Sequence, residues 1–129
     1  MIDHISLTVG DFARSKAFYE AALGAIGYCV LREFGGDVVG FGVPPKPDFW
    51  IRAGQSNTPP VHVAFGVDSR EQVEAFYTAA MAAGGRDNGK PGLRSHYHPD
   101  YYGAFVLDPE GHNIEAVCRQ SSDFPGEKE

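Results

Sequence analysis

Two stretches of this 129-residue chain can be written one above the other without a gap. The first is HISLTVGDFARSKAFYEAALGAIG, residues 4–27, and the second is HVAFGVDSREQVEAFYTAAMAAGG, residues 62–85, at an offset of 58 residues. The aromatic pair Phe18-Tyr19 meets Phe76-Tyr77 in this alignment. Similarity over this length is the signature of an internal duplication. The chain is therefore predicted to contain two copies of one unit.

Each copy begins with a strand followed by a helix. Apolar and polar residues alternate over residues 2–9, and this period of two predicts a strand. Asp11 is a suitable N-cap for a helix over residues 12–23. In the second copy, Ser69 and Gln72 form a capping-box pattern at the equivalent place. These signals define the first two elements of each unit.

Apolar runs separated by turn residues predict further strands in both halves. The last two strands are joined by Asp-Pro-Glu-Gly, in which proline and glycine supply the backbone angles of a tight turn. Each half therefore reads β-α-β-β-β, and the chain is predicted to be an α+β protein. The additional strands are predicted at 27–34, 38–43, 48–53, 102–107 and 112–118. The predicted divisions are a single domain at 1–120, with module one at 1–54 and module two at 61–118, and a flexible tail at 121–129.

Residues 86–99 interrupt the symmetry between the two halves. The segment is rich in glycine, proline and polar residues, and it is longer than an ordinary connection. We predict a loop here, which is either a binding loop or a solvated excursion.

Composition and charge exclude several kinds of partner. The net charge is −6 and no run of lysine or arginine occurs, so neither nucleic acid nor an anionic membrane is expected to bind. No apolar segment reaches the roughly 18 to 20 residues that span a bilayer. The two cysteines, Cys29 and Cys118, are too few for a disulfide framework and indicate reduced thiols. We therefore expect a cytoplasmic protein.

Three residues with metal-binding side chains occupy related strand positions. His4 and His62 begin the two copies and point away from the apolar face of their strands, while Glu115 interrupts an otherwise apolar strand. A buried carboxylate requires a cation or hydrogen-bond donors. Two imidazoles and one carboxylate suit a divalent transition metal and leave coordination positions open. The alternative is that Glu115 simply pairs with one histidine in a buried polar cluster.

The duplicated β-α-β-β-β pattern, the opening IDHISLTVGD, the HVAFGV segment and the ending YYGAFVLDPEGHNIEAV resemble the vicinal oxygen chelate superfamily. That superfamily includes glyoxalase I, extradiol dioxygenases, fosfomycin-resistance enzymes and bleomycin-resistance proteins. The resemblance extends over residues 2–117 and implies a cup-shaped mixed sheet around a metal. It also implies ligands on the first and last strands of each module, which here are His4, a residue near Trp50, His62 and Glu115.

The sequence departs from this pattern at one ligand position. Trp50 aligns with Glu115, within about one residue, and tryptophan does not bind a metal. Glyoxalase I would be expected to carry glutamate at that place, so its specific activity is not implied. The remaining His-His-Glu set is similar to that of extradiol dioxygenases and fosfomycin-resistance enzymes. Bleomycin-binding members, in contrast, lack the metal ligands.

Several other residues are candidates for substrate contacts. Tyr102 and His98, with His96 and Tyr101 nearby, lie where the predicted loop enters the strand at 102–107. They are either general acids or bases, or else the tyrosines pack at the rim and the histidines are solvated. The substrate-binding candidates are Trp50, Arg52, Arg94 and Tyr101. Trp50 would either form an apolar wall or fill the core. Arg52 and Arg94 would either bind an anionic group or reach solvent.

These observations predict a metal-dependent enzyme that acts on a small oxygen-bearing substrate. The expected cofactor is a divalent metal, either Fe, Mn, Zn or Ni, used as a Lewis acid. The triad favours an extradiol-type dioxygenase slightly over a lyase or isomerase. The alternative is a non-catalytic protein that binds a drug or metabolite in the same cup. A homodimer is expected because the resemblance implies pairing of such short chains.

Overall fold

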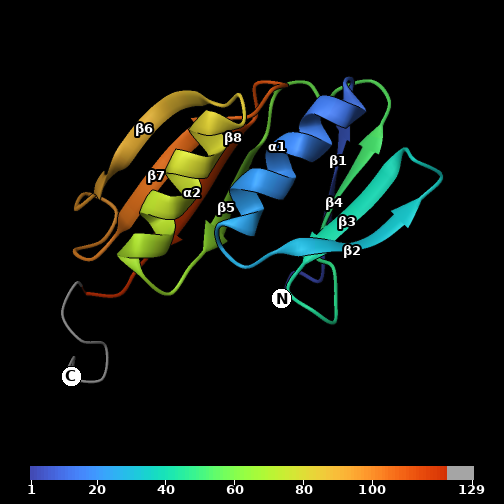
Figure 1. The fold of residues 1–129 in the computed structure, drawn as a ribbon. Helices are drawn as coiled ribbons and strands as arrows, with labels where there is room; N and C mark the ends of the chain where they lie inside the picture. The colour runs from blue at the N-terminus through green and yellow to red at the C-terminus, as the bar shows by residue number, and fades with distance from the viewer. Residues whose placement is uncertain (122–129) are drawn as a thin grey trace.

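The computed structural model describes residues 1–121 and contains two copies of a β-α-β-β-β module (Figure 1). The α+β class and the duplication are confirmed. Module one contains β1 (Ile5–Val9), α1 (Phe12–Gly24), β2 (Cys29–Phe34), β3 (Val38–Gly42) and β4 (Phe49–Ala53). Module two contains β5 (His62–Gly66), α2 (Arg70–Ala82), β6 (Arg86–Leu93), β7 (Tyr102–Leu107) and β8 (Asn113–Cys118). The predicted tail at 121–129 falls almost entirely outside the described residues.

Each module has its own four-stranded sheet. The strand order is β1-β4-β3-β2 in the first sheet and β5-β8-β7-β6 in the second. The first and last strands of each module are parallel neighbours, and the other pairs are antiparallel. Both helices lie on the same side of the sheets and pack against each other (Figure 1). Each sheet therefore has one face under a helix and an opposite, inner face.

The alternation predicted for the first strand of each module decides which residues reach the core. Leu7, Val9 and Phe65 are buried on the helix side, whereas Ser6 and Ala64 are exposed on the inner face. Phe18 and Phe76, which occupy equivalent positions on the two helices, are fully buried. Burying such side chains stabilises the fold by about 1.5–3 kcal/mol each.

The strand registers confirm the alignment of Trp50 with Glu115. Ser6 pairs with Trp50 in module one, and Ala64 pairs with Glu115 in module two. Ser6 and Ala64 are themselves separated by the offset of the duplication, so Trp50 and Glu115 occupy the same place in the two sheets. On the neighbouring strands, Gly40 is the partner of Trp50 and Phe105 is the partner of Glu115.

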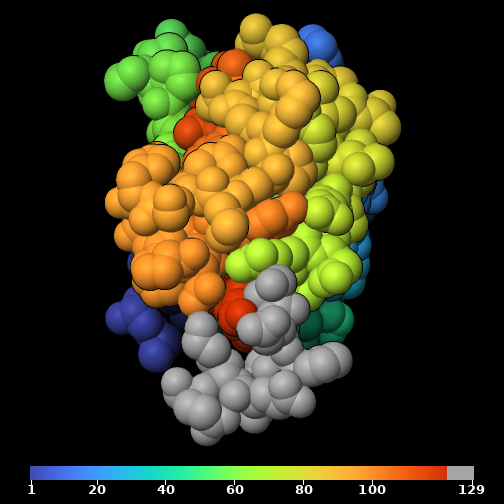
Figure 2. Space-filling view, turned by 90° about the vertical axis from the view of Figure 1, so that its left-hand side faces the viewer, coloured from blue at the N-terminus to red at the C-terminus, as the bar shows by residue number. Residues whose placement is uncertain are grey.

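The predicted loop at 86–99 is wrong for its first half. Residues Arg86–Leu93 form β6, the outer strand of the second sheet, and the register slips between Asp87 and Gly89 and again before Gly92. An edge strand with bulges tolerates glycine and a proline that has no N–H to donate. Figure 2 views the molecule from this side, where β6 and the turn after it fill much of the face. The strand predicted over residues 2–9 also begins later, at Ile5.

The turn between β7 and β8 joins the two modules. Asp108 is buried, and it accepts hydrogen bonds from the backbone N–H groups of Glu110 and His112 and from the hydroxyl of Tyr19 on α1. The Glu110 carboxylate accepts the N–H groups of Gly10 and Asp11 at 3.0 Å each, immediately before α1. Part of the Asp-Pro-Glu-Gly motif therefore connects module two to the start of the first helix. Neither helix in the described part is long and apolar enough to cross a membrane.

Candidate functional site

The inner face of module two contains a cavity of about 380 Å³. Its walls come from β5, β7, β8 and the turn that precedes β7. The lining residues are His62, Tyr97, Tyr101, Phe105, Glu115 and Arg119. Two of the three predicted metal ligands, His62 and Glu115, are therefore brought together here.

Glu115 is 1% exposed, and its two oxygens have different partners. Oε1 lies 2.8 Å from Nε2 of His62, and Oε2 accepts a hydrogen bond from the hydroxyl of Tyr101. The side chain of His62 is 52% exposed, so this nitrogen lies at the border between the protein interior and the cavity. The carboxylate is held in a fixed position by donors on both sides, as burial of a charge requires.

Tyr101 is the donor that orients Glu115 from the far side. Burial and the hydrogen bond to Glu115 raise the pKa of Tyr101 to about 12, which keeps its hydroxyl protonated at neutral pH. The guanidinium of Arg119 lies 4.9 Å from the centre of the Tyr101 ring, and Tyr97 packs against the ring edge. Tyr101 is thus held by an edge contact with Tyr97 and by a cation–π contact with Arg119, which follows β8.

The inner face of module one contains a separate cavity of about 540 Å³. His4, Trp50 and Arg52 line it, together with Phe34 and Lys46. His4 lies beside Asp3, with Nδ1 2.7 Å from Oδ1, and the other Asp3 oxygen pairs with Lys46 at 2.7 Å.

An aromatic floor, formed by Trp50 and Phe34, covers part of this module-one cavity. The two rings are nearly parallel, with an angle of 13° and centroids 6.1 Å apart. A Cβ atom on Gly40 would lie 2.8 Å from the indole ring, so the absence of a side chain at Gly40 is what allows the indole to lie against β3. Trp50 therefore forms a cavity wall and does not fill the core.

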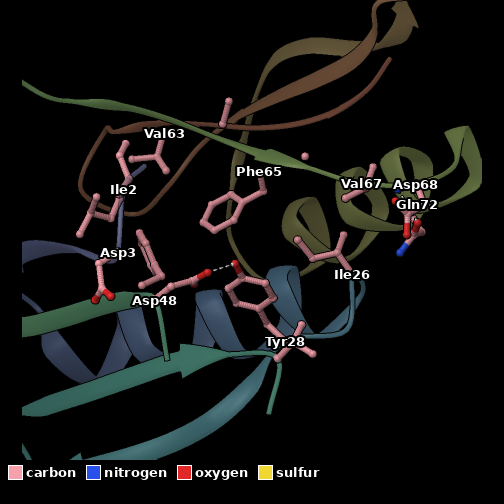
Figure 3. A pocket seen from close by; sticks show the side chains of 15 residues that line it. Ile2, Asp3, Ile26, Tyr28, Asp48, Val63, Phe65, Val67, Asp68 and Gln72 are labelled. Carbon is pink, nitrogen blue, oxygen red and sulfur yellow. Dashed lines mark hydrogen bonds between the residues drawn. The ribbon is translucent and has the colours of Figure 1, made fainter. Parts of the chain in front are cut away.

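A third cavity, of about 450 Å³, opens at the boundary between the modules. Figure 3 shows Tyr28 donating its hydroxyl to Asp48 at 3.0 Å, with the ring of Phe65 beside them. Tyr28 and Phe65 meet edge to face, which joins the segment between α1 and β2 to β5. Burial, with the hydrogen bond to Asp48, raises the pKa of Tyr28 above its ordinary range.

Three other predicted site residues make their hydrogen bonds away from the His62–Glu115 pair. Tyr102 donates to Glu74 on α2 at 2.7 Å, so its hydroxyl points to the helix side of the sheet. Nδ1 of His98 accepts the backbone N–H of Asp100 and serves to shape the turn. Arg94 donates to the carbonyl groups of Gly92 and Lys90, and its guanidinium lies 5.3 Å from the centre of the Phe105 ring, which lines the module-two cavity. We therefore withdraw the general acid or base role suggested for Tyr102 and His98.

The alternation of side chains along β7 is the signal that places Tyr101 and Tyr102 on opposite faces of the sheet. Because Phe105 pairs with Glu115, odd-numbered residues of β7 share the face of Glu115, and Tyr101 continues this series. Arg119 continues the same series from β8. Both residues could be assigned from register. Tyr97 lies in an irregular turn, and no periodic pattern indicates its place.

The donor chemistry at Glu115 fits a divalent metal, but within the described residues only His62 joins Glu115 as a ligand at this cavity. An imidazole nitrogen and a carboxylate oxygen converge on the module-two cavity, and both are ordinary ligands of transition metals. His4 lines the module-one cavity instead. Within residues 1–121, no group of three or more His, Cys, Asp or Glu side chains is arranged to hold a metal ion.

Comparisons with known proteins agree with this architecture. The family model for the glyoxalase/bleomycin resistance protein/dioxygenase superfamily matches residues 1–27. A glyoxalase/bleomycin resistance protein from Albidiferax ferrireducens T118 is 30% identical, with 90% of this chain and 97% of that chain covered and a TM-score of 0.79. A comparison with curated proteins gave no match.

More distant structures share the fold alone. A glyoxalase/bleomycin resistance protein/dioxygenase family enzyme from Burkholderia phytofirmans PsJN is 20% identical, with coverages of 91% and 97% and a TM-score of 0.69. A lactoylglutathione lyase from Agrobacterium tumefaciens is 19% identical, with coverages of 92% and 92% and a TM-score of 0.65. The fold and inner faces define a protein with duplicated β-α-β-β-β modules. The chain belongs to the glyoxalase/bleomycin resistance protein/dioxygenase superfamily.

Proposed function

We propose that this protein is a divalent-metal-dependent enzyme whose active site is completed by two copies of the chain. His62 and Glu115 of one copy and His4 of the other would form the ligand set. The observation that carries the proposal is the His62–Glu115 pair, which borders an open cavity while the third donor lies on the inner face of the other module. Apposition of the two inner faces in a homodimer brings these groups together.

The residues of the chain have separable roles in this site. A bound divalent ion would supply Lewis acidity toward a substrate oxygen. Tyr101 keeps the Glu115 carboxylate in position, and Arg119 places a positive charge over the Tyr101 ring in the same cavity. Trp50, in the place of a fourth ligand, leaves a coordination position to substrate or water and provides an apolar surface that excludes water from it.

Metal content and subunit mixing test the composite site. The His4→Ala and His62→Ala variants should each lose bound metal, because each removes one ligand of every site. When the two variants are unfolded and refolded together, half of the dimers are mixed, and one of the two sites in a mixed dimer has all three ligands. About a quarter of the sites should then regain metal. A site built within one chain regains none, and a monomeric mass in light scattering contradicts the proposal directly.

Ring cleavage of a catechol-like compound is the reaction we place first. A His-His-Glu set with open positions suits iron, and the Trp50–Phe34 floor suits a planar ring. Protein reconstituted anaerobically with Fe(II) should take up one molecule of oxygen for each catechol cleaved, with both oxygen atoms in the ring-opened product. Iron-loaded protein that takes up no oxygen excludes the dioxygenase and leaves lyase or isomerase chemistry. Retained metal without turnover of any substrate class supports a binding protein.

A further inference from the structure

We infer that the module-one cavity binds aromatic carboxylates, with the ring over the Trp50–Phe34 floor and the carboxylate on Arg52. The inference rests on the proposed function in one respect, which is that this cavity would form half of the substrate site. The binding itself requires neither metal nor turnover.

The aromatic floor gives the preference for a planar ring. Trp50 and Phe34 are nearly parallel, and Phe34 is 56% exposed although it is a large apolar side chain. The Trp50 indole lies against the backbone of β3 at Gly40, so its position is set by the sheet. A flat ligand stacked on such a surface gains contact area without reordering the protein, and aromatic stacking adds about 0.5–1.5 kcal/mol beyond burial.

The charges around the cavity give the preference for an anion. Four charged or titratable side chains line it, namely Asp3, His4, Lys46 and Arg52. Asp3 already pairs with both His4 and Lys46. Within residues 1–121, no hydrogen bond or ion pair is found for the guanidinium of Arg52. Arg52 is therefore the cation that remains available, and guanidinium binds a carboxylate through two parallel hydrogen bonds.

Strand geometry places the ring site and the anion site next to each other. Trp50 and Arg52 are two residues apart on β4, so both side chains project from the inner face. Alternate residues of a strand are separated by about 6.6 Å, which is close to the distance from a ring centre to a carboxylate carried by that ring or by a short side chain. The cavity of about 540 Å³ has room for such a molecule.

The chain contains a single tryptophan, so the fluorescence of Trp50 reports directly on this cavity. Benzoate is titrated in the presence of a chelator and compared with benzamide, which has the same shape without the charge, and with cyclohexanecarboxylate, which has the charge without the flat ring. Benzoate should change the emission saturably at about tenfold lower concentration than either analogue, because one lost charge-assisted contact corresponds to about tenfold in affinity.

Two variants assign the preference to residues. Arg52→Gln should remove the advantage of benzoate over benzamide and leave benzamide binding unchanged, while Arg14→Gln, an exposed arginine on α1, should leave both unchanged. Phe34→Leu should remove the higher affinity of benzoate relative to cyclohexanecarboxylate. Equal binding of benzoate and benzamide, or no saturable change up to about 10 mM ligand, overturns the inference. Binding without metal-dependent turnover contradicts the proposed function alone.

Discussion

The two modules have the same strand order and differ most in what occupies one position of their inner faces. In module one, Trp50 lies over Gly40 and forms the floor of an apolar cavity. In module two, Glu115 occupies the same register, opposite Phe105, and is held by His62 and Tyr101. The residue on the neighbouring strand also differs in size. The large indole of Trp50 requires a glycine beside it, whereas the smaller side chain of Glu115 does not.

In the proposed dimer, this difference would give the two modules complementary roles. The carboxylate of Glu115 needs polar partners, and module two supplies them from β5 and from the turn before β7. Trp50 needs only space and a second ring, which Gly40 and Phe34 supply. The proposed dimer, which apposes unlike inner faces, would therefore combine a metal-ligand surface with a surface for the substrate ring.

The largest expected effect comes from making the two modules alike at this position. Trp50→Glu places a carboxylate at the position equivalent to Glu115, and it should raise the affinity for a divalent metal by about tenfold or more. Competition with a chromophoric chelator measures this affinity. Trp50→Gln is the matched control, since it removes the indole and adds no charge. An equal gain in both variants would show that access to the site, and not a fourth ligand, is responsible.

The second prediction concerns the space that Gly40 leaves for the indole. Gly40→Ala adds a methyl group 2.8–2.9 Å from three ring atoms of Trp50, so it should lower the free energy of unfolding by about 2 kcal/mol. Urea unfolding followed by circular dichroism measures the change. The same substitution in a Trp50→Leu background should cost much less.

Gly24→Ala is the control for this experiment. Gly24 ends α1, and a Cβ atom added there meets no neighbour within 4 Å. Because alanine is a better helix former than glycine, this variant should be neutral or stabilised by up to about 1 kcal/mol. Equal destabilisation of both variants contradicts the role given to the indole.

The third prediction tests the hydrogen bond that Tyr101 donates to Glu115 in module two. Tyr101→Phe leaves one oxygen of a buried carboxylate without its hydrogen bond, which should cost about 1–2 kcal/mol of stability. Tyr97→Phe, at an exposed position, should be neutral. In a Glu115→Gln background the loss at Tyr101 should shrink, because the charge has gone. An unchanged loss would assign the effect to packing.

The duplication made most of the fold predictable, and the reason is physical. Side-chain periodicity and capping are local, so the first helix was located to within one residue at both ends, and the capping box of Ser69 and Gln72 located the start of the second. The alignment of Trp50 with Glu115 followed from the same regularity. β6 was missed because Gly89, Pro91 and Gly92 indicate a loop, whereas bulges on an edge strand accommodate them.

The site was less predictable because it depends on how modules meet. His4 and His62 are equivalent in sequence, and equivalence alone does not say whether their faces converge within one chain. The structure places them on separate cavities. Tyr101 and Tyr102 are adjacent, so only the register of β7 with β8 decides which one reaches Glu115.

The smallest predicted effect compares how the two helices begin. The start of α2 is capped within its own module, where Gln72 accepts the N–H of Asp68 at 3.0 Å. The start of α1 depends on Glu110 from the other module, whose carboxylate accepts the N–H groups of Gly10 and Asp11. Glu110→Gln should therefore lower the stability at neutral pH by about 0.5–1 kcal/mol, a modest value because Glu110 is only partly buried.

The pH dependence of this loss identifies its cause. The hydrogen bond from Gly10, followed by other donors, lowers the pKa of Glu110 from its ordinary value of 4.5. A carboxylate with a lowered pKa stabilises the folded state above its unfolded pKa, and this contribution is lost as the pH falls through the folded value. The stabilities of the wild type and Glu110→Gln should therefore converge below about pH 4.5 in chemical denaturation. Glu20→Gln on α1 serves as the control, and a gap that persists in acid would show that the charge on Glu110 does not join the modules.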